Sequence, residues 1–178
     1  MSPVSKGSLK AQALSEVIDK VVGLACALLF GVMTAIVILG VFFRYVLDAP
    51  LNWVEETSRY LMIWGASLAI SIGVSAGEHV GLTVILDALK KPNQRKALSL
   101  VINGAVFLFL AFMFAYSVSA TAESRHQMTQ ALGISMFLPK LAVPTAMLLA
   151  AVQVVLATYL IVQSPEGRRS QGAGFIDI

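Results

Sequence analysis

Charged side chains are scarce in this sequence. Only 13% of its 178 residues are Asp, Glu, Lys or Arg, whereas 57% are hydrophobic. Average globular proteins have about 25% charged and about 45–50% apolar residues. The mean hydropathy of +0.80 therefore excludes a soluble globular domain and predicts an all-α integral membrane protein, with residues 1–178 forming one membrane domain. The net charge of +3 does not indicate nucleic-acid binding, because the basic residues flank apolar runs.

Cysteine and histidine are nearly absent. Cys26 is the single cysteine, so no internal disulfide can form, and its place in an apolar run indicates a small packing residue. The two histidines, His79 and His126, lie outside the apolar runs, which argues against a haem held by two histidines. The sequence also lacks a Walker motif, a zinc-ligand spacing and a nucleophile–base pair. We therefore expect no enzyme activity, catalytic residue, metal site or cofactor.

Four apolar runs are long enough to span a bilayer, which takes about 20 helical residues. The predicted transmembrane helices are residues 21–45, 53–76, 98–119 and 138–162. The first run exceeds the apolar region of a signal peptide, about 7–15 residues, so we interpret it as a retained helix that begins near Ser15–Asp19. None of these four spans holds an ionisable residue away from its ends, which argues against a small stand-alone exporter.

The connections between the spans carry further signals. Pro50 biases its neighbour away from helix, so a short turn joins the first two spans into an antiparallel hairpin. Pro139 suits the first turn of the fourth span, whereas Pro144 is expected to bend that helix unless the helix starts later. Residues 79–90 form a short amphipathic segment, predicted to lie as a helix in the membrane interface. The termini, about 1–14 and 164–178, are predicted to be flexible.

Charged residues gather at the turn between the first two spans. Asn52 precedes Glu55 and Glu56 by three and four positions, as a helix N-cap precedes carboxylates near the positive end of the helix dipole. Arg59 follows Glu55 by one helical turn, and the turn brings Arg44 to the same end of the hairpin. We predict that Arg44 and Arg59 neutralise the two glutamates and hold the first two spans in one register.

Three more residues belong to this candidate contact surface. Trp53 suits the aromatic belt at the level of the lipid headgroups, while Glu78 and His79 follow the second span. His79 lacks companions for a zinc site, so it favours a hydrogen bond in the interface. Two alternatives stay open for the glutamates. They are carboxylates that only stabilise the helix start, or they form a coupling-ion site, although such sites lie at the membrane midplane.

The basic residues also predict orientation. Most of the 13 Lys and Arg residues lie in the leader, in the loop between the second and third spans, and in the tail. By the positive-inside rule, both termini are cytoplasmic and the charged hairpin faces the outer side of a bacterial inner membrane.

With Arg44 closing the first span, N-W-V-E-E-T-S-R-Y (52–60) opening the second and G-E-H-V (77–80) following it, the chain resembles the DctQ-type small membrane subunit of TRAP transporters, the tripartite ATP-independent periplasmic transporters. The resemblance covers nearly the whole chain in span number and loop spacing, and its specific residues lie between Arg44 and His79. One departure falls at Ser135, where relatives commonly carry proline.

The resemblance implies a non-catalytic subunit that scaffolds a large permease subunit in the membrane. A periplasmic binding protein would deliver an organic acid to the pair, and a sodium gradient would drive uptake. A stand-alone multidrug-type exporter and a membrane anchor subunit of a redox enzyme are the alternative functions.

Overall fold

The computed structural model describes residues 6–76 and 92–163. Within these ranges the chain forms the helices α1 (Lys6–Tyr45), α2 (Asn52–Ala76), α4 (Pro92–Glu123), α5 (Phe137–Lys140) and α6 (Ala142–Gln163), with a 3-10 helix η1 at Ser124–His126. One isolated bridge between Met128 and Ser135 is the only β-type pairing in the described part. The all-α class is thus confirmed. The helix predicted at 79–90 and the tail 164–178 lie outside the described residues.

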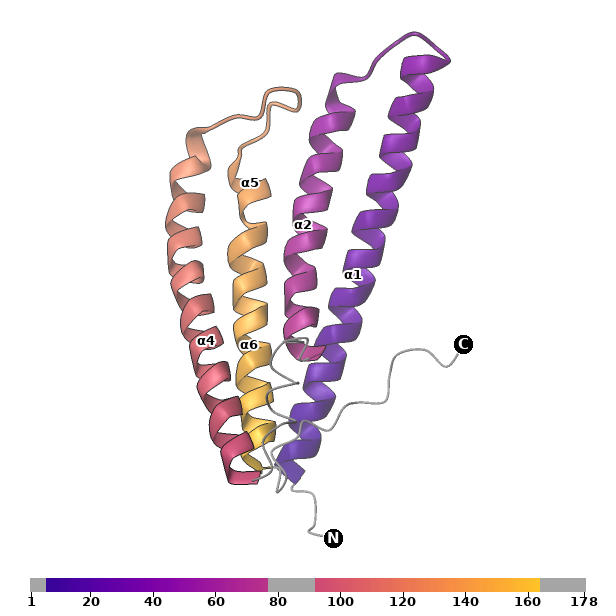
Figure 1. Ribbon diagram of the computed structural model, residues 1–178. Coiled ribbons are helices and arrows are strands. Elements are labelled where there is room, and N and C mark those ends of the chain that lie inside the picture. Colours follow the sequence, from indigo (N-terminus) through magenta and orange to yellow (C-terminus); the bar gives the residue numbers. More distant parts are fainter. Residues whose placement is uncertain (1–5, 77–91, 164–178) are drawn as a thin grey trace, which may run out of the picture.

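The helices run side by side, with α6 between α4 and α2, and α1 on the far side of α2 (Figure 1). The turn between α1 and α2 lies at the same end as residues 127–136, the connecting loop between η1 and α5. We call this the loop end; the opposite end, where Lys6, Pro92 and Gln163 lie, is the terminal end. Because α6 contacts α1, α2 and α4, it forms the centre of the bundle.

The core lies where α6 meets α2 and α4. Its buried apolar side chains are Val74, Leu110, Ala146, Met147, Ala150 and Val154. Ala146, Ala150 and Val154 recur every four residues, so they occupy one face of α6. Alanine lets neighbouring helix backbones approach closely in a membrane, where packing rather than the hydrophobic effect drives helix association.

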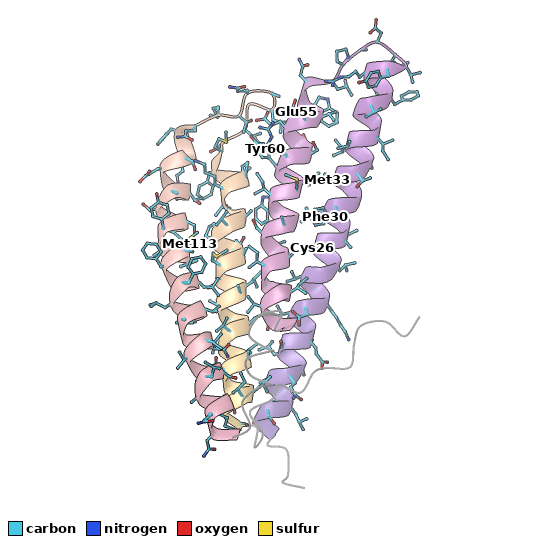
Figure 2. The ribbon with its side chains drawn as sticks, viewed as in Figure 1. Cys26, Phe30, Met33, Glu55, Tyr60 and Met113 are labelled. Carbon is cyan, nitrogen blue, oxygen red and sulfur yellow. The ribbon has the colours of Figure 1, made fainter. Side chains whose placement is uncertain are left out.

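Glycines allow the close contact between α1 and α2. A Cβ added at Gly65 would lie 3.0 Å from ring atoms of Phe30, and one at Gly40 would lie 2.5 Å from a methyl carbon of Val54. The thiol of Cys26 donates a hydrogen bond of 3.4 Å to the carbonyl of Gly65. Cys26 and Phe30 are labelled on α1 in Figure 2. The antiparallel hairpin and the packing role of Cys26 are therefore confirmed.

Three helices are long and apolar enough to cross a membrane: Gly7–Tyr45, Lys96–His126 and Phe137–Gln163. The second predicted span, 53–76, matches the bounds of α2 closely, but α2 is not among these three. Its first turns carry Glu55, Glu56 and Arg59, and serines interrupt its apolar residues, which lowers its hydropathy. The four-span count therefore stays a prediction.

The predicted start of the first helix was wrong. We placed the start of the helix near Ser15–Asp19, after a flexible leader at 1–14, but α1 already includes Lys6. Residues 8–20 contain no glycine or proline and are rich in Ala, Leu, Lys, Gln and Glu, which favour helix even where the apolar run has ended. Asp19 lies within the candidate span Gly7–Tyr45, but this range of 39 residues is about 58 Å of helix, about twice the thickness of the hydrocarbon core. The argument against an exporter, that no ionisable residue lies deep in a span, therefore stays a prediction.

The fourth predicted span, 138–162, is divided into α5 and α6 at Leu141. Pro144 has no N–H to donate to the carbonyl of Lys140, four residues earlier. The hydroxyl of Thr121 on α4 instead donates a hydrogen bond of 3.3 Å to that carbonyl. Pro144 lies in the first turn of α6, so the bend expected for a proline deeper in the helix stays a prediction, and α4 supplies the hydrogen bond that the carbonyl of Lys140 lacks within the helix.

Candidate functional site at the loop end

The carboxylate of Glu56 holds the connecting loop against α2. One of its oxygens, Oε2, accepts hydrogen bonds from the backbone N–H groups of Ala131 at 2.7 Å and Leu132 at 2.9 Å. The other, Oε1, accepts a hydrogen bond of 2.6 Å from the Tyr60 hydroxyl, one turn further along α2. Three donors therefore stabilise the negative charge of Glu56. We call this arrangement the Glu56 clasp.

The connecting loop has a built internal structure. The N–H of Thr129 bonds the carbonyl of Ile134 at 2.8 Å, and the N–H of Met136 bonds that of Gln127 at 2.8 Å. Gly133, with φ of 63°, occupies the left-handed conformation that glycine adopts without strain. These bonds place the two N–H groups of the clasp at the tip of a closed turn.

Ser135 also stabilises this loop. Its hydroxyl donates a hydrogen bond of 2.9 Å to the carbonyl of Arg125 and accepts one of 3.3 Å from the N–H of Phe137. The Arg125 guanidinium lies 5.1 Å from the centre of the Phe137 ring, within the range of cation–π attraction. Ser135 therefore ties both ends of the connecting loop together.

Large apolar side chains remain exposed around the clasp. Met128, Ile134 and Leu138 are exposed large hydrophobic residues of this end. Hydrogen bonds fix the backbone that carries Met128 and Ile134, so their positions do not depend on a partner. We call these three residues the loop-end platform. Exposed apolar patches of this kind mark surfaces that contact other proteins or a membrane.

The predicted ion pairs at this end were only partly right. Arg59 bonds Glu55 at 2.7 Å, with 59% and 79% of the two side chains exposed, and Glu55 lies at the loop end of α2 beside Tyr60 (Figure 2). An ion pair that is this exposed contributes only about 0.3–0.5 kcal/mol to the stability of the helix. Arg44 is exposed and forms no ion pair within the described part of the chain. Glu55 is already paired within α2, and Glu56 is turned to the connecting loop.

The remaining predicted site residues have different outcomes. Asn52 is the first residue of α2, but in residues 6–76 and 92–163 its side chain makes no capping hydrogen bond, so the predicted cap was wrong. Trp53 is exposed at the loop end, where an aromatic belt residue belongs. Glu78 and His79 lie outside the described residues. The structure thus brings Glu56 and Tyr60 together with the connecting loop, a contact that sequence spacing did not predict.

A second polar cluster, also missed by the sequence analysis, joins α1, α2 and α6. Gln153 is 1% exposed; its amide nitrogen donates a hydrogen bond of 3.0 Å to Asp19, and its oxygen accepts one of 2.7 Å from Ser15. The Ser75 hydroxyl donates to the second oxygen of Asp19 at 2.6 Å. We call this cluster the Asp19–Gln153 network. The lone glutamine among the apolar residues of 142–162 was the available signal.

The clasp and the network lie far apart along α2. Nineteen residues separate Glu56 from Ser75, which corresponds to about 28 Å of helix. The hydrocarbon core of a bilayer is about 30 Å thick. The polar contacts between helices are thus found near both ends of the apolar segment, while glycine and alanine packing joins the helices between them.

Replacing Glu56 by alanine is expected to release the connecting loop. The N–H groups of Ala131 and Leu132 would lose their charged acceptor, so their hydrogen exchange should become roughly tenfold faster or more. Exchange followed by mass spectrometry on residues 127–136 measures this effect. Glu55→Ala is the matched control, because its carboxylate bonds only Arg59 and should leave the loop unchanged. Equal exchange in both variants would contradict the clasp.

Comparison with known proteins shows to which family the chain is similar. The family model described as "Tripartite ATP-independent periplasmic transporters, DctQ component" matches residues 33–164, which include the Glu56 clasp and Gln153 but not Asp19. A Haemophilus influenzae protein named as a TRAP transporter small permease protein is 32% identical over 78 residues, 44% of this chain. The chain spans about half, 48%, of that relative.

A second relative extends the comparison along the chain. The ectoine TRAP transporter small permease protein TeaB of Halomonas elongata is 27% identical over 142 residues, 79% of this chain and 73% of that protein. The family match covers most of the bundle, and three helices of the bundle suit a membrane. The chain therefore belongs to the DctQ component family, the small permease subunits of TRAP transporters.

Proposed function

We propose that this chain serves a sodium-driven TRAP transporter as a non-catalytic scaffold. In this proposal it packs beside a large permease subunit that carries the substrate path, and it helps to dock a periplasmic binding protein that delivers an organic acid. Family membership carries the proposal. The bundle supports it, because polar networks and close helix packing fix α1, α2 and α6 relative to one another, as a stationary scaffold requires.

The exposed apolar faces also support this role. Leu24, Leu28 and Val32 on α1 and Leu108 and Phe112 on α4 are exposed large hydrophobic residues. Lipid and a partner's helices are the surroundings in which such faces are stable. The scaffold proposal uses part of this surface for the large permease subunit and leaves the rest to lipid.

The loop-end platform is the surface that we assign to the binding protein. In the orientation favoured by the basic residues, both termini are cytoplasmic and the platform faces the periplasm. Its backbone is fixed by the Glu56 clasp, so docking would not have to order a flexible loop, and such preorganisation lowers the cost of binding.

Cysteine labelling tests this placement. In a Cys26→Ala background, Met128→Cys in spheroplasts is expected to react with a membrane-impermeant maleimide, and addition of the purified binding protein should slow the reaction. Val162→Cys, exposed near the terminal end, is the matched control and should react only after the membrane is opened. Labelling of Val162→Cys alone would reverse the orientation. An unchanged rate at Met128→Cys would remove the platform from the docking surface.

A further inference from the structure

The tip of the connecting loop forms a site for a carboxylate. The N–H groups of two successive residues, Ala131 and Leu132, meet one oxygen of Glu56 at 2.7 Å and 2.9 Å. Successive N–H groups in a turn form a concave site that binds anions, and protein domains use such backbone sites to capture a C-terminal carboxylate. Glu56 therefore occupies a site whose donors belong to the backbone of the loop, and these donors suit any carboxylate that reaches them.

The shape of this site is fixed by the loop itself. The N–H of Gly133 bonds the carbonyl of Thr129 at 3.2 Å, and the N–H of Ile134 bonds the Thr129 hydroxyl at 3.1 Å. Thr129 is only 3% exposed, so it anchors the turn from inside. None of these bonds involves Glu56. The turn therefore keeps its two outer N–H groups close together when a different carboxylate takes the place of Glu56.

The site is open to solvent, and an exchange of its ligand leaves no polar group unpaired. Ala131 is exposed and Glu56 is half-buried, so a second carboxylate can approach. The incoming carboxylate would accept the same two N–H bonds. The displaced Glu56 would keep the bond of 2.6 Å from the Tyr60 hydroxyl to its other oxygen. Arg59 follows Glu56 by three residues on α2, a spacing at which helical side chains of opposite charge attract each other.

The place of the site decides which carboxylate can compete with Glu56. A free organic acid loses its translational freedom on binding, whereas Glu56 is already fixed to the same molecule. A carboxylate on a docked protein is also held in place, so it competes at a high effective concentration. Met128 and Ile134 of the loop-end platform lie on either side of the site in the sequence and are exposed. A protein seated on this platform would reach the two N–H groups.

We propose that the loop tip is an exchangeable carboxylate site. Glu56 fills it in the free chain, and an Asp or Glu side chain of the docked periplasmic binding protein displaces Glu56 from it. This exchange rests on the docking role proposed above and gives it a chemical contact. It also gives docking a consequence within the bundle, because the connecting loop changes its ligand from a side chain of α2 to one of the partner.

A free carboxylate tests the site without the partner. In Glu56→Ala the site is vacant, and hydrogen bonds to a charged group predict a Kd of about 10–100 mM for acetate. Sodium acetate at about 0.2 M should therefore slow hydrogen exchange of residues 127–136 about threefold or more. Sodium chloride at the same concentration is the control for ionic strength. The unchanged chain should not respond to acetate, because Glu56 already fills its site. Equal effects of acetate and chloride on Glu56→Ala would overturn the site.

Docking affinity tests the displacement. This chain and the large permease subunit are placed together in lipid nanodiscs, and the Kd of the purified binding protein is measured. Glu56→Gln keeps the size of the side chain but bonds the two N–H groups more weakly, since its oxygen carries no charge. If Glu56 leaves the site open about a tenth of the time, Glu56→Gln should lower the Kd by up to about tenfold. Glu55→Gln is the matched control, because it removes the same charge from a carboxylate that bonds Arg59, and it should leave the Kd unchanged.

The direction of the change in Kd is decisive. If Glu56 only holds the loop in place, Glu56→Gln loosens the loop and docking becomes weaker. An equal or higher Kd in Glu56→Gln, with normal docking to the unchanged complex, would overturn the displacement of Glu56. An equal decrease in Glu55→Gln would assign the effect to net charge and would also overturn it. Absence of docking to the unchanged complex would refute the docking role and with it the displacement, whereas the acetate result would still decide whether the loop tip binds carboxylates.

Discussion

Proteoliposomes that contain this chain alone are expected to show no sodium-dependent uptake of organic acids, whereas those that also contain the large permease subunit and are supplied with the binding protein should transport. The reason is the division of labour proposed above: transport by alternating access needs a part that moves against a fixed part, and this chain supplies only the fixed part. Uptake of a labelled organic acid, followed over time at an imposed sodium gradient, measures the effect.

Omitting this chain from the complete system is the decisive comparison, and it should reduce uptake to the level of empty vesicles. Collapsing the sodium gradient with an ionophore should do the same, whereas adding ATP should change nothing. Two results would refute the proposal: uptake by this chain alone, or undiminished uptake by the other two proteins without it.

Breaking the Asp19–Gln153 network should destabilise the bundle more than any other single side-chain change at a helix contact. Gln153→Leu keeps the apolar bulk but leaves Asp19 and Ser15 without the buried amide that they contact. Interhelical hydrogen bonds in membranes contribute about 0.6 kcal/mol on average and up to about 2 kcal/mol. Because Gln153 makes more than one such bond, we expect a loss of about 1–2 kcal/mol in the free energy of unfolding.

Unfolding in mixed detergent micelles measures this loss. Gln163→Leu is the matched control, since Gln163 is exposed at the end of α6, and it should change the free energy of unfolding by less than about 0.5 kcal/mol. A double-mutant cycle with Asp19→Asn and Gln153→Leu should show non-additive losses because the two side chains contact each other. Strictly additive losses would mean that Asp19 and Gln153 stabilise the bundle independently.

Much of the fold could be predicted because a membrane helix appears in the sequence as a long run of apolar residues. The bounds of α2 differ from the predicted 53–76 by one residue. The start of α1 was missed because apolar composition reports where a helix is in lipid, not where helical hydrogen bonding begins. Residues 6–20 include five charged side chains, yet their helix-favouring composition continues α1 beyond the apolar run.

The candidate site was harder to predict than the helices. The spacing of Glu55 and Arg59 within one helix correctly gave their ion pair. The partners of Glu56 are backbone N–H groups more than 70 residues away, and backbone donors leave no signal in the residue types of a sequence. The same holds for Asp19 and Gln153, since only the packing of α1 against α6 brings them together.

The interruption at Leu141 leaves the two short ends of the helix joined. Leu141 keeps helical dihedral angles and its N–H bonds the carbonyl of Phe137 at 3.0 Å, so α5 continues into α6. The carbonyl of Lys140 accepts a bond from Thr121 on α4. The connecting loop before α5 is bonded to α2 by the Glu56 clasp. A partner that binds the connecting loop would therefore contact a segment that is joined to α2, α4 and α6 at once.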